Sequence, residues 1–425
     1  MQLTEWIDLY RDSLVHCIHP VDSGKMDGWK LSDGKIKRDD GAFFTIEGYG
    51  FKSNFSGHQQ EEALLINQPE TGILGFLIAV ENDQTFILCQ AKSEPGNVHV
   101  TQIGPSVQAT VSNYQRKHGG LPQPYLSFFT ELTGPPVISV KQSEQGYRFL
   151  DKYNLNTVVQ TEKVNIDITG NKYRWYNIED IAANINRDFL FNTDFKSVFA
   201  SLLEMRIIQK LQSFKPESLF LNSYIHYQEK ENVIAAYQQI KILRNKTSIQ
   251  RNRIPIERLN DWHINDNGVV PTVPLDYGVG WFDVTLEDRE VGHWQQPLFV
   301  KSSMDTSVLF YYTENNAYHF IFRTGYEPGF RNKIQLAPTM SDTRGNINLM
   351  DIGTVTHKFQ QSDEGGRFFQ NISEYVLLEV KNVEPFRDCS GYCVLNVFSI
   401  CQLLKIPGVF TNETRTLVAA LHGWL

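Results

Sequence analysis

The segment Ala91–Gln108 reads AKSEPGNVHVTQIGPSVQ, and a related phrase, TGYEPGFRNKIQLAPTMS, fills Thr324–Ser341. Both carry Glu-Pro-Gly, a glutamine eight residues after the glutamate, and a proline three residues further on. The two glutamates, Glu94 and Glu327, are 233 residues apart. A phrase of this length, written twice at such a distance, predicts that the chain contains a duplicated unit.

The same spacing extends beyond the phrase, since it also pairs Trp29 with Trp262. Near the ends of the units the spacing shortens to 219 residues, where FNTDFKSVFASLL at 191–203 aligns with FTNETRTLVAALH at 410–422. A unit of about 210 residues is too long for a solenoid repeat, so each copy is expected to be a domain-sized repeat. The predicted division places the first repeat at 1–220 and the second at 221–425.

Each repeat is expected to contain strands in its middle and helices near its end. TFILCQAK and YHFIFRT have the composition of strands, whereas NIEDIAANI and LNVFSICQLLK have helical spacing and a nearby asparagine that can cap the helix. Strands with flanking helices predict an α/β (α+β) fold, with one mixed β-sheet and its covering helices in each repeat.

The composition argues against nucleic acid, a membrane and a metal ion as partners. The net charge of −8 and the pI near 5.8 argue against nucleic acid, because neutralising phosphates requires clustered cations. No run approaches the roughly 18 apolar residues of a membrane span, and no cysteine or histidine spacing indicates a zinc site. We therefore expect a cytoplasmic protein with reduced thiols, no membrane contact and no bound metal.

The first copy of the phrase carries more polar groups than the second. If FILCQAKSE is a strand, Ile87, Cys89 and Ala91 face a packed side, and the residues between them face the opposite side. The following strand, PSVQATVSNY, has an equally regular polar face. Two such faces in one sheet would form a cleft, although a solvated sheet face or a plain Glu-Pro-Gly turn explains the pattern equally well. The cleft would be lined by Gln90, Lys92, Glu94, Gln108 and Thr110.

The second copy keeps Glu327 but places Gly325 and Ser341 where the first has Lys92 and Gln108. This asymmetry predicts a working site in the first repeat and a binding or vestigial site in the second. No dinucleotide, P-loop or metalloprotease motif occurs, so acid–base chemistry without a cofactor is expected. His118, before two glycines, is a further candidate, with a surface histidine as the plain alternative.

The phrases GWKLSDGKIKRDDGAFFTIEGYGFK, INQPETGILGFL, QAKSEPGNVHVTQIGPSVQATVSNYQRKHGG and REVGHWQQPL resemble the NDP-hexose 2,3-dehydratases of deoxysugar biosynthesis. The resemblance runs along nearly the whole chain and implies two repeats similar to Nudix hydrolases, assembled as a homodimer. The Nudix metal box is absent, because Arg289-Glu290-Val291 continues as GHWQQ without paired glutamates. Metal-dependent cleavage of a pyrophosphate is therefore disfavoured.

The implied reaction is loss of water from an NDP-4-keto-6-deoxyhexose, most often the dTDP-glucose derivative. It gives a 3,4-diketo-2,6-dideoxy sugar that an NAD(P)H-dependent 3-ketoreductase would consume, and it needs no cofactor. In our hypothesis Glu94 removes the C3 proton, Lys92 or Gln108 stabilises the enolate, and Glu94, His118 or Tyr114 protonates the leaving hydroxyl. Alternatives are a sugar-nucleotide-binding protein without activity and a diverged Nudix-type hydrolase. The predicted substrate-binding residues are Gln90, Asn97, Ser106, Thr110, Ser112 and Asn113 in the first repeat and Arg289, Trp294, Arg323 and Glu327 in the second.

Overall fold

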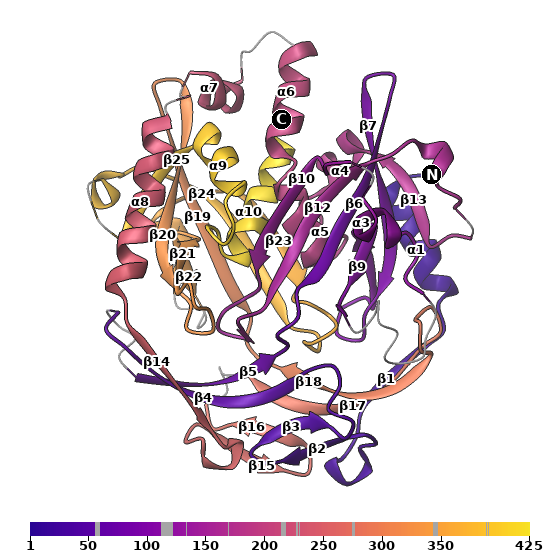
Figure 1. Cartoon of the computed structure of the whole chain (residues 1–425). Helices are drawn as coiled ribbons and strands as arrows, with labels where there is room; N and C mark the ends of the chain where they lie inside the picture. The colour runs from indigo at the N-terminus through magenta and orange to yellow at the C-terminus, as the bar shows by residue number, and fades with distance from the viewer. Residues whose placement is uncertain are drawn as a thin grey trace.

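The computed structural model describes residues 1–425 except 56–59, 112–121, 133, 169, 214–217, 227, 229, 274–276, 343–346, 388 and 390. In this described part of the chain the strands form four sheets, and helices lie between and around the two larger ones (Figure 1). The mixed α/β class predicted from the sequence is confirmed. No helix within these ranges is long and apolar enough to cross a membrane.

The two seven-stranded sheets have the same topology. In each, the central hairpin pairs with a parallel strand on one side and with further strands on the other, and corresponding strands are related by the spacings found in the sequence. The first sheet contains β6 (Gly72–Glu81), β7 (Gln84–Ser93), β8 (Thr101–Gly104), β9 (Val107–Ala109), β10 (Ile138–Ser143), β12 (Tyr153–Gln160) and β13 (Tyr173–Asn177). The second contains β19 (Asp305–Glu314), β20 (Ala317–Tyr326), β21 (Ile334–Ala337), β22 (Met340–Asp342), β23 (Gly353–Ser362), β24 (Ile372–Val380) and β25 (Tyr392–Asn396).

The two smaller sheets exchange their first strands. β1 (His16–Pro20) pairs with β17 (Gly278–Leu286) of the second repeat, and β14 (Ile249–Ile254) pairs with β4 (Thr45–Ser53) of the first. The two halves are therefore interlocked through main-chain hydrogen bonds as well as through packing. The remaining strands are β2 (Trp29–Ser32), β3 (Lys35–Arg38), β5 (Gln60–Asn67), β11 (Phe149–Leu150), β15 (Trp262–Asn265), β16 (Gly268–Pro271) and β18 (His293–Val300).

Helices α5 (Thr193–Ala200) and α10 (Asn412–Ala420) pack against each other between the large sheets (Figure 1). Each begins at a side-chain cap, because Asn192 accepts from the Phe195 amide and Thr411 from the Thr414 amide. Their apolar residues share one buried cluster with both sheets. The other helices are α1 (Leu3–Ser13), α3 (Ser127–Thr130), α4 (Ile178–Asn184), α6 (Leu203–Ser213), α7 (Leu219–Ile225), α8 (Lys230–Lys246) and α9 (Val397–Leu404).

Candidate active site

Two cavities lie where the repeats meet, and each is lined by residues of both. Cavity 1, of about 560 Å³, surrounds the ends of β7 and β9. Cavity 2, of about 530 Å³, surrounds the matching ends of β20 and β22. Both volumes suit a small organic ligand.

The strand alternation predicted for β7 explains how its polar side chains reach cavity 1. Ile87, Cys89 and Ala91 are buried in the main core, while Lys92 and Glu94 line the cavity. A strand turns successive side chains to opposite faces, so the packed residues fix the direction of the polar ones. The sequence-predicted Gln108 and Thr110 line the same cavity.

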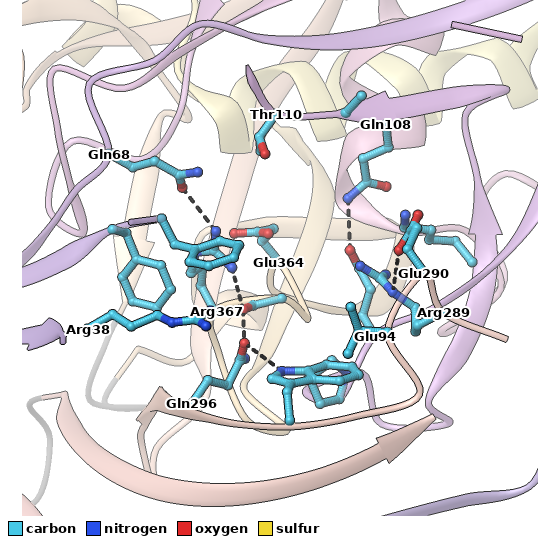
Figure 2. A pocket seen from close by; sticks show the side chains of 18 of the residues that line it. Arg38, Gln68, Glu94, Gln108, Thr110, Arg289, Glu290, Gln296, Glu364 and Arg367 are labelled. Carbon is cyan, nitrogen blue, oxygen red and sulfur yellow. Dashed lines mark hydrogen bonds and ion pairs between the residues drawn. The ribbon is translucent and has the colours of Figure 1, made fainter. Parts of the chain in front are cut away.

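Glu94 is held from two sides. Gln108 donates its amide hydrogen to Oε1 of Glu94 at 2.8 Å (Figure 2). Asn97 donates to Oε2 of Glu94 at 3.4 Å. Gln108 is itself oriented, because Asn192 donates to its carbonyl oxygen at 3.1 Å. Since Asn192 also caps α5, the start of this helix determines the position of the glutamate.

Lys92 brings a cation close to Glu94 in a buried position. Only 5% of its surface is exposed, and within the described residues no hydrogen bond or ion pair occupies its ammonium group. Burial first, and then the positive charge of Arg289, lower the pKa of Lys92 to about 8, although Glu290 and Glu94 oppose this. The side chain therefore remains mostly protonated at neutral pH and can stabilise a negative charge in the cavity.

The second repeat contributes Arg289, Glu290 and Trp294 to cavity 1. Arg289 donates to the carbonyl oxygen of Ser93 at 2.9 Å and pairs with Glu290 at 3.4 Å. Burial opposes ionisation of Glu290, but Arg289 and Lys92 outweigh it and lower its pKa to about 2. The sequence-predicted Arg289 and Trp294 thus lie at the first-repeat cavity, across the boundary between the repeats.

Three further carboxyl groups line cavity 1, and sequence reasoning did not find them. They are Glu144, Asp194 and Glu364. Burial raises the pKa of each, to about 7 for Glu364. Glu144 accepts from Asn154 and from Asn412, whereas Oδ1 of Asp194 is buried without a hydrogen-bond partner in the described structure.

The side of the cavity away from Lys92 is aromatic and cationic. The guanidinium of Arg38 lies 4.7 Å from the ring centre of Phe43, and that of Arg367 lies 4.2 Å from Phe44. Arg367 also donates to Gln68 at 3.1 Å. Figure 2 shows Arg38 and Gln68 on one side and Glu94, Gln108 and Arg289 on the other, with Glu364 between them.

The repeated Glu-Pro-Gly phrase has a clear packing role. A side chain at Gly96 would collide with the carbonyl oxygen of Phe368, and one at Gly329 with that of Phe149. The amide of Gly96 donates to Gly365 at 2.7 Å, and that of Gly329 donates to Gly146 at the same distance. Each phrase therefore fixes a loop of the other repeat, and these loops are Ser143–Phe149 and Ser362–Phe368.

The recurring glutamines support the same loops. Gln102 donates to the hydroxyl of Ser362 at 3.1 Å, and Gln335 donates to that of Ser143 at 2.9 Å. The repeated sequences SEQGYRF and SDEGGRF were the signal available for finding Glu364 and Arg367. They show which residues correspond, but not that the loops reach into the opposite cavity.

Several sequence-predicted residues lie elsewhere. Gln90 is buried beside Tyr173 of β13, and Ser106 is fixed between two main-chain groups of β6 and β7, so neither lines the cavity. Asn97 acts on the cavity only through Glu94. The remaining first-repeat candidates lie outside the described residues, and these are Ser112, Asn113, Tyr114 and His118.

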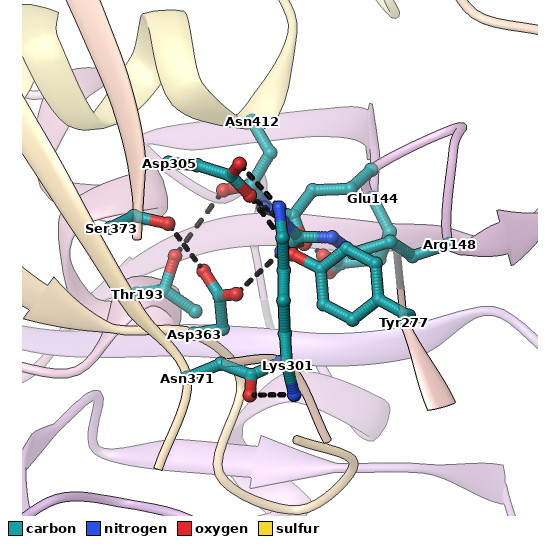
Figure 3. A network of polar contacts seen from close by, with 11 residues as sticks. Glu144, Arg148, Thr193, Tyr277, Lys301, Asp305, Asp363, Asn371, Ser373 and Asn412 are labelled. Atoms are coloured by element: carbon teal, nitrogen blue, oxygen red, sulfur yellow. Dashed lines mark hydrogen bonds and ion pairs between the residues drawn. The ribbon is translucent and has the colours of Figure 1, made fainter. Parts of the chain in front are cut away.

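Cavity 2 contains the predicted Arg323 and Glu327. Its second arginine, Arg148, is held in ion pairs with carboxylates of the protein. Arg148 pairs with Asp363 at 2.6 Å and with Asp305 at 2.9 Å, as Figure 3 shows. Lys301 makes a further pair with Asp305. The charges of Arg148 and Lys301 are therefore neutralised within this network, whereas Arg323 also lines the cavity.

The glutamate of cavity 2 also differs from Glu94. Glu327 accepts a hydrogen bond from the main-chain amide of Gly146 at 2.8 Å. Burial raises the pKa of Glu327 to about 8, so it holds its proton at neutral pH. It is a weak candidate for a general base.

Comparison with known proteins gives a consistent result. The family model described as NDP-hexose 2,3-dehydratase matches residues 1–202 and 234–421. The chain is 26% identical over 423 residues to the dTDP-4-dehydro-6-deoxy-alpha-D-glucopyranose 2,3-dehydratase of Saccharopolyspora spinosa, covering 94% of this chain and 86% of that protein. It is 28% identical over 422 residues to the Streptomyces violaceoruber protein of the same name, with 93% and 91% coverage. For the Amycolatopsis orientalis protein of that name the identity is 26% over 447 residues, with 98% and 89% coverage.

Proposed function

The chain belongs to the NDP-hexose 2,3-dehydratase family, a family of hydro-lyases, and from this premise we propose that cavity 1 dehydrates a dTDP-linked 4-keto-6-deoxyhexose. The observation that carries the proposal is the convergence of Glu94, Lys92 and Gln108 in one cavity. The choice of dTDP follows the names of the three relatives. The sugar would lie toward Lys92 and Glu94.

Glu94 is the proposed general base. The C4 ketone acidifies the proton on C3, so a held carboxylate can remove it. The electron pair of the C3–H bond then forms the enolate of C3, C4 and the C4 oxygen. The amide hydrogen bonds from Gln108 and Asn97 orient the carboxylate for this step.

Lys92 is the proposed stabiliser of the enolate. Its ammonium group is buried and carries no hydrogen bond or ion pair within the described residues, so it can meet an oxyanion without first breaking another contact. A fixed charge in a dry site stabilises developing negative charge more strongly than water does. Collapse of the enolate then restores the C4 ketone, forms a C2–C3 double bond and expels the 2-hydroxyl group.

The product of this elimination is an enol at C3. Its tautomerisation gives the 3,4-diketo-2,6-dideoxy sugar, so the net change is loss of one water molecule. We assign the nucleotide to the aromatic and cationic side, where Arg367 and Arg38 line the cavity and can bind phosphate, beside Phe44 and Trp29 in the cavity wall.

The direct test is incubation with dTDP-4-keto-6-deoxyglucose, NADPH and a 3-ketoreductase that traps the diketone, followed by mass spectrometry of the sugar nucleotide. Loss of the C2 oxygen supports dehydration. Unchanged substrate with measurable binding supports a non-catalytic binding protein, and release of a nucleoside monophosphate supports a Nudix-type hydrolase.

Residue roles are tested in the same assay. Glu94→Gln and Lys92→Ala are each expected to abolish most product formation. Glu81→Gln is the matched control, because Glu81 ends the neighbouring strand, is exposed and lies outside cavity 1. Full activity in both cavity variants would rule out this site.

The proposal includes four further features. They are a homodimer, a cytoplasmic location, a Nudix-like fold of each repeat with the division near residue 220, and a downstream NAD(P)H-dependent 3-ketoreductase. The last follows from chemistry, because a 1,2-diketone is reactive and needs prompt reduction. Light scattering of the purified protein tests the dimer.

A further inference from the structure

The loop Ser362–Phe368 of the second repeat reaches into the cavity of the first. Glu364 and Arg367 from this loop line cavity 1. The loop is fixed by the Gly96–Gly365 main-chain hydrogen bond and by Gln102, which donates to Ser362. A side chain presented by such a braced loop has a defined position.

Glu364 and Glu94 converge on one point of the cavity wall. A carbon added to Gly366 would lie 2.8 Å from Oε1 of Glu364 and 3.9 Å from Oε1 of Glu94. The two carboxyl groups thus approach the same small volume from different repeats, as Figure 2 shows. Two carboxyl groups around one substrate carbon pair are the usual arrangement for removing a proton at one atom and supplying one at the next.

Burial favours the protonated form of Glu364. Burial has the largest effect, and the negative charges of Glu94 and Glu144 add to it, while Arg367 and Lys152 act in the opposite direction. The balance raises the pKa of Glu364 to about 7. A substantial protonated fraction is therefore present at neutral pH, which a general acid requires.

We propose that Glu364 is the general acid that protonates the departing 2-hydroxyl group, while Glu94 accepts the C3 proton. This inference rests on the proposed dehydratase function and deepens it. The Glu364 proton moves to the C2 oxygen, the C2–O bond breaks with its electron pair, and water leaves. Glu364 is left as carboxylate and Glu94 as carboxylic acid, so the protons balance.

The inference makes the active site composite, with the base on the first repeat and the acid on the second. It replaces the expectation that Glu94 returns its own proton to the leaving group. The main competitor within the described residues is Asp194, because burial also raises the pKa of Asp194 and its Oδ1 has no hydrogen-bond partner there. Asp194→Asn is therefore the comparison variant.

The experiment measures removal of the C3 proton separately from loss of the leaving group at C2. Wild type, Glu364→Gln, Glu94→Gln and Asp194→Asn are incubated with dTDP-4-keto-6-deoxyglucose in D₂O, and deuterium at C3 of the remaining substrate is measured. In parallel they receive the 2-deoxy-2-fluoro analogue of that substrate, and fluoride release is measured. Fluoride is a stable anion that leaves without a proton, so the analogue bypasses the general acid.

We expect Glu364→Gln to lose dehydration by about 10²–10⁴-fold but to keep C3 exchange and to release fluoride within about tenfold of wild type. Glu94→Gln should lose exchange and fluoride release together. Retained exchange also shows that Glu364→Gln is folded and binds substrate. Glu364→Asp, which keeps the acid but shortens it, should recover part of the dehydration.

The inference is overturned if Glu364→Gln dehydrates normally, if it melts like wild type yet loses exchange and fluoride release, or if only Asp194→Asn shows the acid-deficient pattern. Failure of wild type to dehydrate the parent substrate would instead contradict the proposed function itself. The two failures are therefore distinguishable.

Discussion

Cavity 1 and cavity 2 are built from matching positions of the two repeats, yet they offer different chemistry. Both have a glutamate after the central hairpin, Glu94 in one and Glu327 in the other. Cavity 1 adds Lys92, where cavity 2 has Gly325. A ligand in cavity 1 therefore meets a buried lysine next to the carboxylate, whereas in cavity 2 the nearest cation on the same strand is Arg323, four residues before Glu327.

The exchanged loops sharpen the contrast. The loop that enters cavity 1 brings Glu364 and Arg367, and the loop that enters cavity 2 brings Gln145 and Arg148 at the same positions. Arg367 rests on Phe44 and donates to neutral oxygens, whereas Arg148 is held by two carboxylates. The same arginine is thus available to an anionic ligand in one cavity and committed to an internal network in the other.

The comparison shows what a duplicated scaffold keeps and what it changes. The same residue types hold the exchanged loops in both halves. They are Gly96 and Gln102 in the first repeat and Gly329 and Gln335 in the second. The acid–base groups around those supports differ. Backbone packing therefore accounts for the repeated phrase, and the side chains around it account for the asymmetry.

The largest predicted difference between the cavities concerns their glutamates. Glu94→Gln should lower kcat by about 10²–10⁴-fold, because it removes the general base. Glu327→Gln should change kcat by less than about threefold, since Glu327 already holds its proton at neutral pH. Steady-state kinetics with the trapping reductase measures both, and equal losses would contradict the assignment of the chemistry to cavity 1.

Replacing the two loop arginines should have different effects, one on stability and the other on substrate binding. Arg148→Ala leaves Asp363 buried without its cation and should reduce the free energy of unfolding by about 3–5 kcal/mol. Arg367→Ala should cost less than about 1.5 kcal/mol of stability, because it loses hydrogen bonds to neutral groups, but it should raise KM about tenfold or more. Urea denaturation and kinetics on both variants separate stability from binding.

The buried carboxyl group of Glu364 should make the folded protein less stable as pH rises. Gln145, at the matching position of the other repeat, has no proton to lose. The pKa of Glu364 is raised by burial from 4.5 to about 7, so the folded protein holds this proton more tightly than the unfolded chain. Stability present below about pH 4.5 is then lost as pH rises through about 7. Glu364→Gln should raise the free energy of unfolding at about pH 8 by on the order of 1–3 kcal/mol, with little change near pH 4. Equal stability of the two proteins at both pH values would argue against a protonated Glu364.

The smallest predicted effect is on the pH dependence of kcat/KM. Wild-type kcat/KM should fall as pH rises through about 7, when Glu364 loses its proton, and fall more steeply above about 8, when Lys92 loses its charge. Lys92→Arg should retain the first decline and lose the second, a difference of about tenfold one pH unit above the second step. An unchanged steep decline in Lys92→Arg would remove the role given to the ammonium group.

The sequence predicted the parts of the site that depend on local geometry. Strand periodicity placed Lys92 and Glu94 on one side of β7, and Gln108 on the matching side of β9, because side-chain direction in a strand follows from position alone. The same rule also predicted that Gln90 lines the cleft, but in the structure Gln90 is buried beside Tyr173. Periodicity gives the face of a residue, but not the point along the strand at which a cavity begins.

The amino-acid order by itself determined the duplication, the mixed α/β class, the alternation within β7 and the resemblance to the dehydratase family. Only the tertiary structure brought Arg289, Trp294, Glu364 and Arg367 from the second repeat to the cavity of the first. The physical reason is that local patterns fix backbone direction over a few residues, whereas the exchanged strands and loops bury their surface against the other repeat. Which distant segments meet is decided by that packing.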